Sequence, residues 1–306
     1  MNQRDLLLEL SHNCNLSCSM CGFGSQRNRP DQFMTREVLE CLLESIEPAP
    51  RSVRLNGRGE STIHPRFQEF LRRIREVWPN TDVHLNTNLA TDRVDLVDAL
   101  ADDEVLIYVS VDSSDRAELE RIRRGLSMDR LESNLERLER MKRRPLMLFT
   151  LQEANLHRIQ DIAVYAARWK CGIIYNVVRY DDDDSHLINQ VLLRYPDVRE
   201  EFVEARRTME TAGLPCYMPD RIKGVSLDIN GCCSTHGGVE HCPAVDSELC
   251  ILFNGDVTPC NMFNPYVYGN LIEQDFAEIL GGEAARTFRE TRVENAYCRD
   301  CACMGA

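Results

Sequence analysis

The sequence predicts an α/β fold, a partial (βα)6 barrel over residues 1–212 followed by a small domain over residues 213–306. Two observations lead to this prediction. Short apolar runs of β type alternate six times with amphipathic stretches of helical period up to about residue 180. After residue 212, glycines, cysteines and short hairpin-like runs replace that alternation. Regular alternation indicates parallel βα units, which place ligands at the carboxyl ends of their strands.

The expected strands are short apolar runs at residues 6–10, 53–55, 83–85, 105–111, 146–151 and 173–178. The clearest helical periodicity falls at residues 38–46, 67–77, 131–141 and 156–166. In the C-terminal part, Asn254-Gly255 separates the strand candidates 249–253 and 256–258. This dipeptide predicts a hairpin with a two-residue turn.

Composition limits the classes of function. The chain has 306 residues, of which 43% are hydrophobic, enough for an ordinary buried core. Its formal net charge of −13 argues against nucleic-acid binding, which needs a basic surface, and permits a cationic substrate. No apolar run is long enough for a membrane helix, and the start MNQRDLLLEL lacks the basic segment of a secretion signal. We therefore expect a cytoplasmic protein without a membrane partner.

The 14 cysteines cluster at spacings typical of metal ligands. In a reducing compartment, such spacings indicate metal or redox chemistry and not disulfides. The first cluster lies in SHNCNLSCSMCGFG, directly after the first expected strand, where Cys14, Cys18 and Cys21 form a C-x3-C-x2-C motif. Three thiolates from one loop can hold a [4Fe–4S] cluster and leave the fourth iron open for a chelating ligand. The alternative is a zinc site completed by His12.

This motif and its position resemble the radical S-adenosylmethionine (SAM) superfamily, in which the open iron binds the amino and carboxylate groups of SAM. LNGRGEST at residues 55–62 resembles the glycine-rich segment of that superfamily, although Arg58 replaces its first glycine. Each of the other matching segments, taken alone, is also typical of a turn or a cap. The resemblance implies a SAM site made by Gly59, Glu60, Asn86, Asn88, Ser110, Asp112 and the carboxylate-binding Arg124.

A second group of cysteines lies in the C-terminal part and resembles the SPASM/twitch auxiliary-cluster domain. Because the printed sequence ends five residues after the last C-x2-C pair, we expect the shorter twitch form with one auxiliary [4Fe–4S] cluster. The resemblance implies four ligands, Cys242, Cys260, Cys298 and Cys301, with Cys303 as a possible substitute. A structural zinc site is the alternative.

The remaining cysteines have less defined roles. Cys41 and Cys171 fit core positions of a helix and a strand, and Cys216, Cys232 and Cys233 have no assigned role. Cys250 exceeds the four-ligand count, and by strand alternation it lies on the face opposite Ile251 and Phe253. From its position in the strand alone, Cys250 is predicted to be a buried packing residue.

The chain as a whole, with the surplus cysteine in CILFNGDVTPC, resembles aminoglycoside epimerases of the neomycin C type. The resemblance implies that a 5′-deoxyadenosyl radical removes a hydrogen atom from a sugar ring and that the Cys250 thiol returns one on the opposite face. It also implies a cationic aminoglycoside substrate and an electron donor such as ferredoxin or flavodoxin. Asp181, Asp182, Asp183 and Asp184 could pair with ammonium groups, or form a solvated loop.

Three other functions are considered. A twitch dehydrogenase of an aminocyclitol or sugar would oxidise the substrate and need no thiol donor. A peptide-modifying radical SAM enzyme commonly carries a leader-binding domain, for which we expect no room because the first strand begins near residue 5. A non-enzymatic iron–sulfur or zinc protein would not need the open coordination position that the first cysteine motif predicts.

Overall fold

The computed structural model describes residues 5–22, 32–178, 185–219, 221–222, 225–227, 248–260, 266–294 and 298. The chain forms two compact units. Unit 1 comprises residues 1–14, 26–86 and 235–306, and unit 2 comprises residues 15–25 and 87–234. Residues near the two ends of the sequence therefore belong to the same unit.

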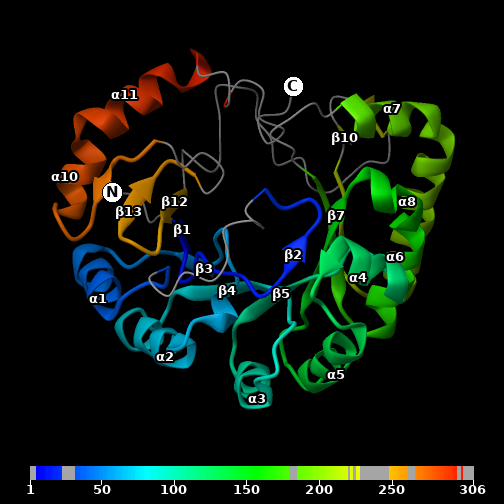
Figure 1. The fold of residues 1–306 in the computed structure, drawn as a ribbon, viewed down its shortest axis with the longest axis horizontal. Helices are drawn as coiled ribbons and strands as arrows, with labels where there is room; N and C mark the ends of the chain where they lie inside the picture. The colour runs from blue at the N-terminus through cyan, green and yellow to red at the C-terminus, as the bar shows by residue number, and fades with distance from the viewer. Residues whose placement is uncertain are drawn as a thin grey trace. The chain divides into compact units, whose positions relative to one another are not determined.

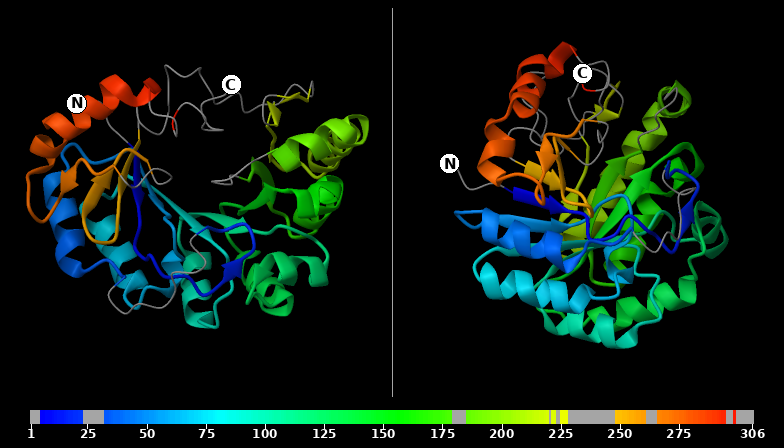
Figure 2. Two further views of the ribbon diagram at one scale, coloured as in Figure 1. Left: turned by 45° about the horizontal axis from the view of Figure 1, so that its top comes forward. Right: turned by 60° about the vertical axis from the view of Figure 1, so that its left-hand side comes forward.

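The sheet of unit 1 has the strand order β14-β13-β12-β1-β3-β4. Its strands are β1 (Asp5–Leu8), β3 (Ser52–Leu55), β4 (Asp82–Thr87), β12 (Glu248–Ile251), β13 (Asp256–Thr258) and β14 (Gly269–Asn270). β12, β1, β3 and β4 are parallel, whereas β13 and β14 continue the sheet in antiparallel fashion. Figures 1 and 2 show the gold β12 and β13 beside the dark blue β1.

The two faces of this sheet differ in polarity. Val53, Leu55 and Val83 are wholly buried, whereas Arg54 and His84, which alternate with them, are half-buried. Helices α1 (Arg36–Ser45) and α2 (Phe67–Val77) lie on one side of β1, β3 and β4 (Figures 1 and 2). Right-handed βαβ crossovers place successive helices on the same face, so the apolar face meets the helices. The face that carries Arg54 and His84 is here called the inner face of unit 1.

Local sequence explains where the helices of unit 1 begin. Thr35 caps α1 by accepting from the Val38 N–H over 3.3 Å, and Asp275 caps α10 by accepting from the Ala277 N–H over 2.8 Å. The remaining helical elements of this unit are η1 (Ser61–Ile63), α10 (Phe276–Gly281), α11 (Glu283–Thr291) and η3 (Arg292–Glu294).

Unit 2 has the strand order β5-β7-β8-β9, and β5, β7, β8 and β9 are parallel. Its strands are β2 (Ser17–Cys18), β5 (Leu106–Ser110), β6 (Arg123–Arg124), β7 (Leu146–Leu151), β8 (Gly172–Val177), β9 (Cys216–Tyr217), β10 (Arg221–Ile222) and β11 (Val225–Ser226). Its helices are α3 (Val94–Asp102), α4 (Arg116–Ile122), α5 (Met128–Leu138), η2 (Glu153–Arg158), α6 (Ile159–Arg168), α7 (Ser185–Leu193) and α8 (Tyr195–Thr211). Tyr175 joins the sheet to the helices, because its ring packs on Phe149 and Phe202 and its hydroxyl donates to the Ile159 carbonyl oxygen over 2.7 Å.

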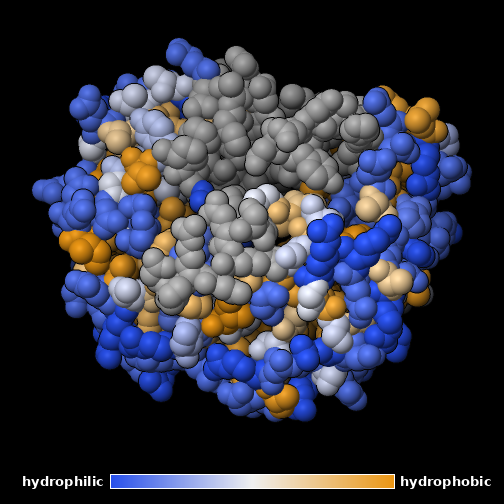
Figure 3. Space-filling view, viewed as in Figure 1, coloured by the Kyte–Doolittle hydropathy of each residue, from blue (hydrophilic) through white to orange (hydrophobic). Residues whose placement is uncertain are grey.

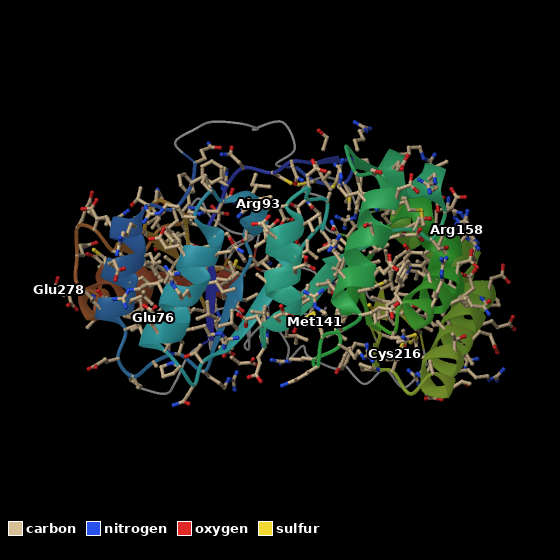
Figure 4. All side chains as sticks on the ribbon, turned by 90° about the horizontal axis from the view of Figure 1, so that it is seen from below. Glu76, Arg93, Met141, Arg158, Cys216 and Glu278 are labelled. Carbon is tan, nitrogen blue, oxygen red and sulfur yellow. The ribbon has the colours of Figure 1, made fainter. Side chains whose placement is uncertain are left out.

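The outward helix faces are mainly hydrophilic, as the blue margins of Figure 3 show. Ion pairs such as Arg73–Glu40, 2.9 Å apart, lie among these side chains. Figure 4 shows Glu76 on α2 and Arg158 next to α6, both on the helical side of their units. Such half-buried surface pairs keep the helices solvated and contribute little stability each.

The predicted α/β fold with a mostly parallel sheet is confirmed, and each expected strand lies within two residues of its predicted position. Several strands and pairings were not predicted, among them β9, which pairs with β8, and the parallel pairing of β12 with β1. The predicted two-residue hairpin turn is wrong. The Leu252 N–H donates to the Asp256 carbonyl oxygen over 2.9 Å, which leaves a three-residue connection in which Gly255 alone has a positive φ, of 90°.

No helix in the described part of the chain is both long and apolar enough to span a bilayer. The predicted domain boundary at residue 212 stays a prediction. The strands β12–β14 lie in the same sheet as β1, so the sheet of unit 1 combines residues from both predicted domains.

Candidate active site

The loop of the first cysteine motif begins where β1 ends. The Glu9 N–H donates to the Ile251 carbonyl oxygen over 2.9 Å, and the His12 N–H to the Gln32 carbonyl oxygen over 3.0 Å. Cys14, at the end of this segment, is half-buried. Backbone hydrogen bonds therefore fix the path of the chain up to the first cysteine.

Gly59 supports this loop from the turn that follows β3. A Cβ atom at residue 59 would lie 2.3 Å from the carbonyl oxygen of Asn13 and 2.4 Å from that of Ser11. The next residue, Glu60, donates its N–H to the Asn13 carbonyl oxygen over 2.8 Å. Only glycine permits this approach of two backbones. The position of Gly59 beside the cysteine loop agrees with the predicted SAM segment, although its contact with SAM stays a prediction.

Glu9 links the cysteine loop to the same turn. Its side chain is 1% exposed, one oxygen lies 3.1 Å from His12 Nδ1, and the other accepts from the Arg58 N–H over 2.7 Å. The ring of His12 also contacts that of Phe253 at 5.5 Å. His12 was the predicted fourth ligand of the alternative zinc site, whereas in the structure this imidazole faces Glu9.

Glu60 itself is buried and caps the helical turn η1. Its Oε1 accepts from the Thr62 N–H over 3.2 Å and from the Thr62 hydroxyl over 2.7 Å. The predicted place of Glu60 in the SAM site stays a prediction.

Asn86, near the end of β4, and Asn88, just after that strand, differ in their hydrogen bonding. The Asn86 Oδ1 atom is buried and has no hydrogen-bond partner among the described residues. Asn88 instead donates to Asn15 Oδ1 and accepts from the Ala90 N–H, each over 2.8 Å. An unsatisfied buried oxygen is costly unless a donor arrives, which suits Asn86 to its predicted place in the SAM site.

Asp112 follows β5 and is completely buried. Its Oδ1 accepts from the Thr150 N–H over 2.8 Å, and its Oδ2 lies 2.7 Å from Arg123 Nε. Ser110, two residues earlier, is half-buried at the end of the strand. Both residues lie at the carboxyl end of β5, as predicted. The Asp112 carboxylate, however, already contacts Thr150 and Arg123.

The predicted carboxylate-binding arginine, Arg124, is exposed, and its neighbour Arg123 is buried. Arg123 Nη1 lies 3.9 Å from Cys18 Sγ, as a hydrogen-bond donor to sulfur. Neighbouring residues of a strand point to opposite faces. In β6, the face that carries Arg123 is therefore buried and the face that carries Arg124 is exposed. Sequence reasoning missed Arg123, because the RRG segment does not reveal which arginine faces inward.

Cys18 and Cys21 lie in one turn, in which the Cys21 N–H donates to the Cys18 carbonyl oxygen over 3.1 Å. Cys18 is half-buried and Cys21 is exposed. Among the described residues, no three His, Cys, Asp or Glu side chains already converge as a metal site. The assignment of Cys14, Cys18 and Cys21 as ligands stays a prediction from their spacing.

Of the predicted auxiliary ligands, Cys260 and Cys298 are half-buried. The other predicted residues lie outside the described residues: Cys242, Cys301, Cys303, Cys232, Cys233, Asp181, Asp182, Asp183 and Asp184.

Cys171 is buried immediately before β8, as expected for a core position, and burial raises the pKa of its thiol to about 12. Cys41 is half-buried on α1, and Cys216 lies in β9 (Figure 4).

Cys250 lies in β12, directly opposite Leu7 of β1. Its side chain packs with those of Leu7 and Leu252, and the residue is 1% exposed. Leu7 is also in register with Arg54, so Cys250 projects onto the inner face of unit 1. Burial raises the pKa of the Cys250 thiol far above its usual range, opposed by a hydrogen bond with Thr258. The predicted alternation is confirmed, because Cys250 and Ile251 lie on opposite faces.

Comparison with known protein families agrees with this geometry. The sequence profile of the radical SAM superfamily matches residues 8–166, more than half of the chain. The chain belongs to the radical SAM superfamily. The profile of the SPASM iron–sulfur cluster-binding domain matches residues 242–302. This radical SAM protein therefore uses SAM and a [4Fe–4S] cluster, and its C-terminal part is a SPASM-type domain of the kind that binds auxiliary clusters.

One relative is the tungsten-containing aldehyde ferredoxin oxidoreductase cofactor-modifying protein of Pyrococcus furiosus, 22% identical over 98% of this chain and 88% of its own. Among solved structures, anSMEcpe with bound AdoMet and the Kp18Cys peptide has a TM-score of 0.72 at 17% identity, over 98% of this chain and 88% of its own. BtrN in complex with AdoMet and 2-DOIA has a TM-score of 0.54 at 14% identity, over 99% and 94%. At these identities, the solved structures show a common fold.

Each unit contributes described residues whose chemistry suits a cluster with bound SAM. The cysteine motif supplies thiol ligands from one loop, Gly59 holds the backbone of that loop, and the Arg123 guanidinium approaches the Cys18 sulfur. The unsatisfied Oδ1 of Asn86 provides an acceptor for a hydroxyl group. The chemistry of these groups agrees with the cofactors that the family uses.

Proposed function

We propose that this radical SAM enzyme inverts one carbon centre of an aminosugar, of the kind converted between neomycin C and neomycin B, and that Cys250 returns the hydrogen atom. The observation that carries the proposal is the buried Cys250 thiol on the inner face of unit 1. Epimerisation needs a hydrogen-atom donor on the face opposite to abstraction. A buried thiol outside the predicted set of cluster ligands is suited to that role.

The protonation state of Cys250 supports this role. Burial raises the pKa of the Cys250 thiol well above neutrality, so the sulfur carries its hydrogen at physiological pH. A thiolate could not donate a hydrogen atom. When bound, the first cluster and SAM supply a 5′-deoxyadenosyl radical that removes hydrogen from the substrate. Transfer from Cys250 then breaks the weaker S–H bond and forms the stronger C–H bond.

Thr258 gives the thiol a defined direction. It lies opposite Cys250 in the antiparallel pair β12–β13, and the two side chains form a hydrogen bond. The Thr258 hydroxyl donates to the Cys260 carbonyl oxygen over 3.3 Å, so the same oxygen is available to accept from the thiol. After the transfer, the sulfur radical needs one electron and one proton to regain its S–H bond. A reduced iron–sulfur centre or an external one-electron donor would supply that electron.

The acidic net charge of the chain supports a cationic substrate, whereas the acidic side chain that shares the face of Cys250 in β12 is already paired with Arg54. Glu248 lies two residues before Cys250 and therefore on the same face, with its side chain 17% exposed. Burial raises the pKa of Glu248, and Arg54, 3.5 Å away, opposes this. The net charge of the chain, −13, favours polycationic ligands in general.

Two other reactions are kept as alternatives, each with a specific reason. Dehydrogenation of an aminocyclitol or sugar is kept from the sequence analysis, and BtrN, which shares the fold, was solved with AdoMet and 2-DOIA. The Pyrococcus furiosus relative and the peptide-bound anSMEcpe support modification of a cofactor or a peptide. Product mass separates these reactions, because an epimer has the mass of its substrate, whereas a dehydrogenated product is lighter by two hydrogen atoms.

The deciding experiment is anaerobic turnover of neomycin C in D2O by the wild type and by Cys250→Ala. We expect wild type to give an isomer with one deuterium at the inverted carbon, because the thiol exchanges with solvent. Cys250→Ala should retain its iron content and still form 5′-deoxyadenosine with substrate, yet yield no epimer. The matched control is Cys171→Ala, another buried cysteine, which should keep epimerisation.

Thr258→Val is isosteric and removes the hydroxyl, so it should increase the 5′-deoxyadenosine formed per epimer, and Thr258→Ser should restore the wild-type ratio. Epimer formation by Cys250→Ala would make Cys250 a packing residue and contradict the proposal. Loss of auxiliary-cluster iron in that variant would make Cys250 a ligand instead. A product two mass units lighter would establish the dehydrogenase reaction.

A further inference from the structure

Arg123 is a buried arginine that reaches the predicted cluster ligand Cys18 from a different segment of unit 2. β6 and β2 are antiparallel, and Arg123 is the direct partner of Cys18 in that pair. The Ser19 N–H donates to the Ile122 carbonyl oxygen over 2.7 Å, which fixes the two segments together. Arg123 Nη1 then lies 3.9 Å from Cys18 Sγ.

Asp112 holds this guanidinium in place from the opposite side. Arg123 Nε lies 2.7 Å from Asp112 Oδ2, and the two side chains are 8% and 0% exposed. The Thr150 N–H fixes the other carboxylate oxygen over 2.8 Å, and Asn155 Nδ2 donates to the Asp112 carbonyl oxygen over 2.9 Å. Removing one partner of a buried ion pair leaves an uncompensated buried charge, so Arg123 and Asp112 depend on each other.

We propose that Arg123 is a positioning residue for the radical SAM cluster, which holds the Cys18 sulfur by an N–H···S bond and raises the reduction potential of the cluster. Reduction adds negative charge to a cluster, and a nearby guanidinium stabilises that charge. Hydrogen bonds to ligand sulfurs are among the factors that set cluster potentials. A planar guanidinium can address Asp112 and Cys18 at once through Nε and Nη1, whereas the single ammonium of lysine is a point charge.

This role differs from the SAM-carboxylate contact that was predicted for Arg124. Arg124 is exposed on the opposite side of β6, so it provides a control of the same residue type at the adjacent position. The reduction potential of the first cluster is a property of the enzyme without SAM and substrate. It is therefore independent of whether the enzyme acts on an aminosugar, a cofactor or a peptide.

The test is an EPR-monitored redox titration of full-length, reconstituted enzyme without SAM. Wild type, Arg123→Gln, Arg123→Lys and Arg124→Gln are compared, and a final addition of SAM identifies the signal that belongs to the first cluster. We expect Arg123→Gln to decrease the ratio of reduced to oxidised cluster about tenfold at a fixed poise, which for a one-electron couple is about 59 mV. Arg123→Lys should show a smaller decrease, and Arg124→Gln should match the wild type.

SAM affinity, measured on the same samples, separates the two possible roles. A wild-type potential in both Arg123 variants would overturn the proposal, and an accompanying loss of SAM affinity would assign Arg123 to the carboxylate of SAM. If Arg123→Gln does not take up the cluster, the loaded Arg123→Lys decides the outcome. Failure of both variants to load, while Arg124→Gln loads normally, would also overturn the proposal and make the Arg123–Asp112 pair a structural element only.

Discussion

At the scale of single residues, Gly59 shows how one missing side chain supports a site. Its backbone lies so close to the loop before Cys14 that a Cβ atom would overlap the carbonyl oxygens of Ser11 and Asn13. Backbone atoms cannot move aside as a flexible side chain can. The conformation of the cysteine loop therefore depends on a glycine that need not bind any ligand itself.

We predict that Gly59→Ala destabilises the protein by about 1–3 kcal/mol and lowers the iron retained by the first cluster, because the loop must shift away from the turn. Anaerobic reconstitution followed by iron analysis and thermal unfolding measures both effects. Gly281→Ala is the matched control, because a Cβ atom there meets nothing within 4 Å, and it should be neutral or slightly stabilising. Equal iron content in Gly59→Ala and wild type would show that the loop tolerates the methyl group.

At the scale of elements, His64 joins the turn η1 to the start of α2 and to the segment before α1. The Arg66 N–H donates to His64 Nδ1 over 3.1 Å, so the other ring nitrogen carries the proton and donates to the Met34 carbonyl oxygen over 2.9 Å. Burial lowers the pKa of His64, with Arg66 lowering it further and Glu69 and the Met34 carbonyl opposing. The neutral imidazole is therefore the form that holds these segments together.

Because the pKa of His64 is lower in the folded state, the unfolded state binds a proton first as the pH falls below about 6.5. The stability that the neutral ring contributes is complete above that pH and is lost as the pH falls towards the folded pKa. Wild type should lose up to about 1.4 kcal/mol per pH unit in this range relative to His64→Gln. Anaerobic urea unfolding of both proteins between pH 5 and 7.5 measures this difference. Parallel stability curves would contradict the assignment.

At the scale of the whole molecule, the strand β12 makes the sheet of unit 1 depend on distant parts of the sequence. β1 pairs with β12 over residues 5–8 and 248–251, and Leu6 and Leu7 are each 1% exposed. A chain that ends at residue 212 would lose this partner and uncover an apolar strand edge. The side chain of Cys250, the proposed hydrogen-atom donor, packs with Leu7 at the same contact.

We predict that a fragment of residues 1–212 does not fold as an independent domain. It should associate through the uncovered edge of β1 and lose cooperative unfolding and near-UV circular dichroism. Anaerobic size-exclusion chromatography and thermal unfolding of the fragment and of the full chain, prepared in parallel, test this expectation. A monomeric fragment with cooperative unfolding would support the boundary that the sequence pattern places at residue 212.

The sequence by itself determined the features that depend on local periodicity and spacing. Alternating apolar runs predicted the parallel strands, because hydrophobic period reflects local geometry. The spacing of Cys14, Cys18 and Cys21 predicted a radical SAM protein, which the superfamily match confirms. The alternation along β12 also placed Cys250 on the face opposite Ile251 before any contact was known.

The tertiary structure decided the features in which distant segments meet. It selected Arg123 over Arg124, because only the approach of β2 determines which face of β6 is buried. In the structure, the carboxylate of Asp112 pairs with Arg123, whereas the sequence predicted that Asp112 contacts SAM. The tertiary structure also paired β12 with β1, although more than 200 residues separate them. Such pairings depend on which surfaces exclude water together, and local sequence patterns do not record that information.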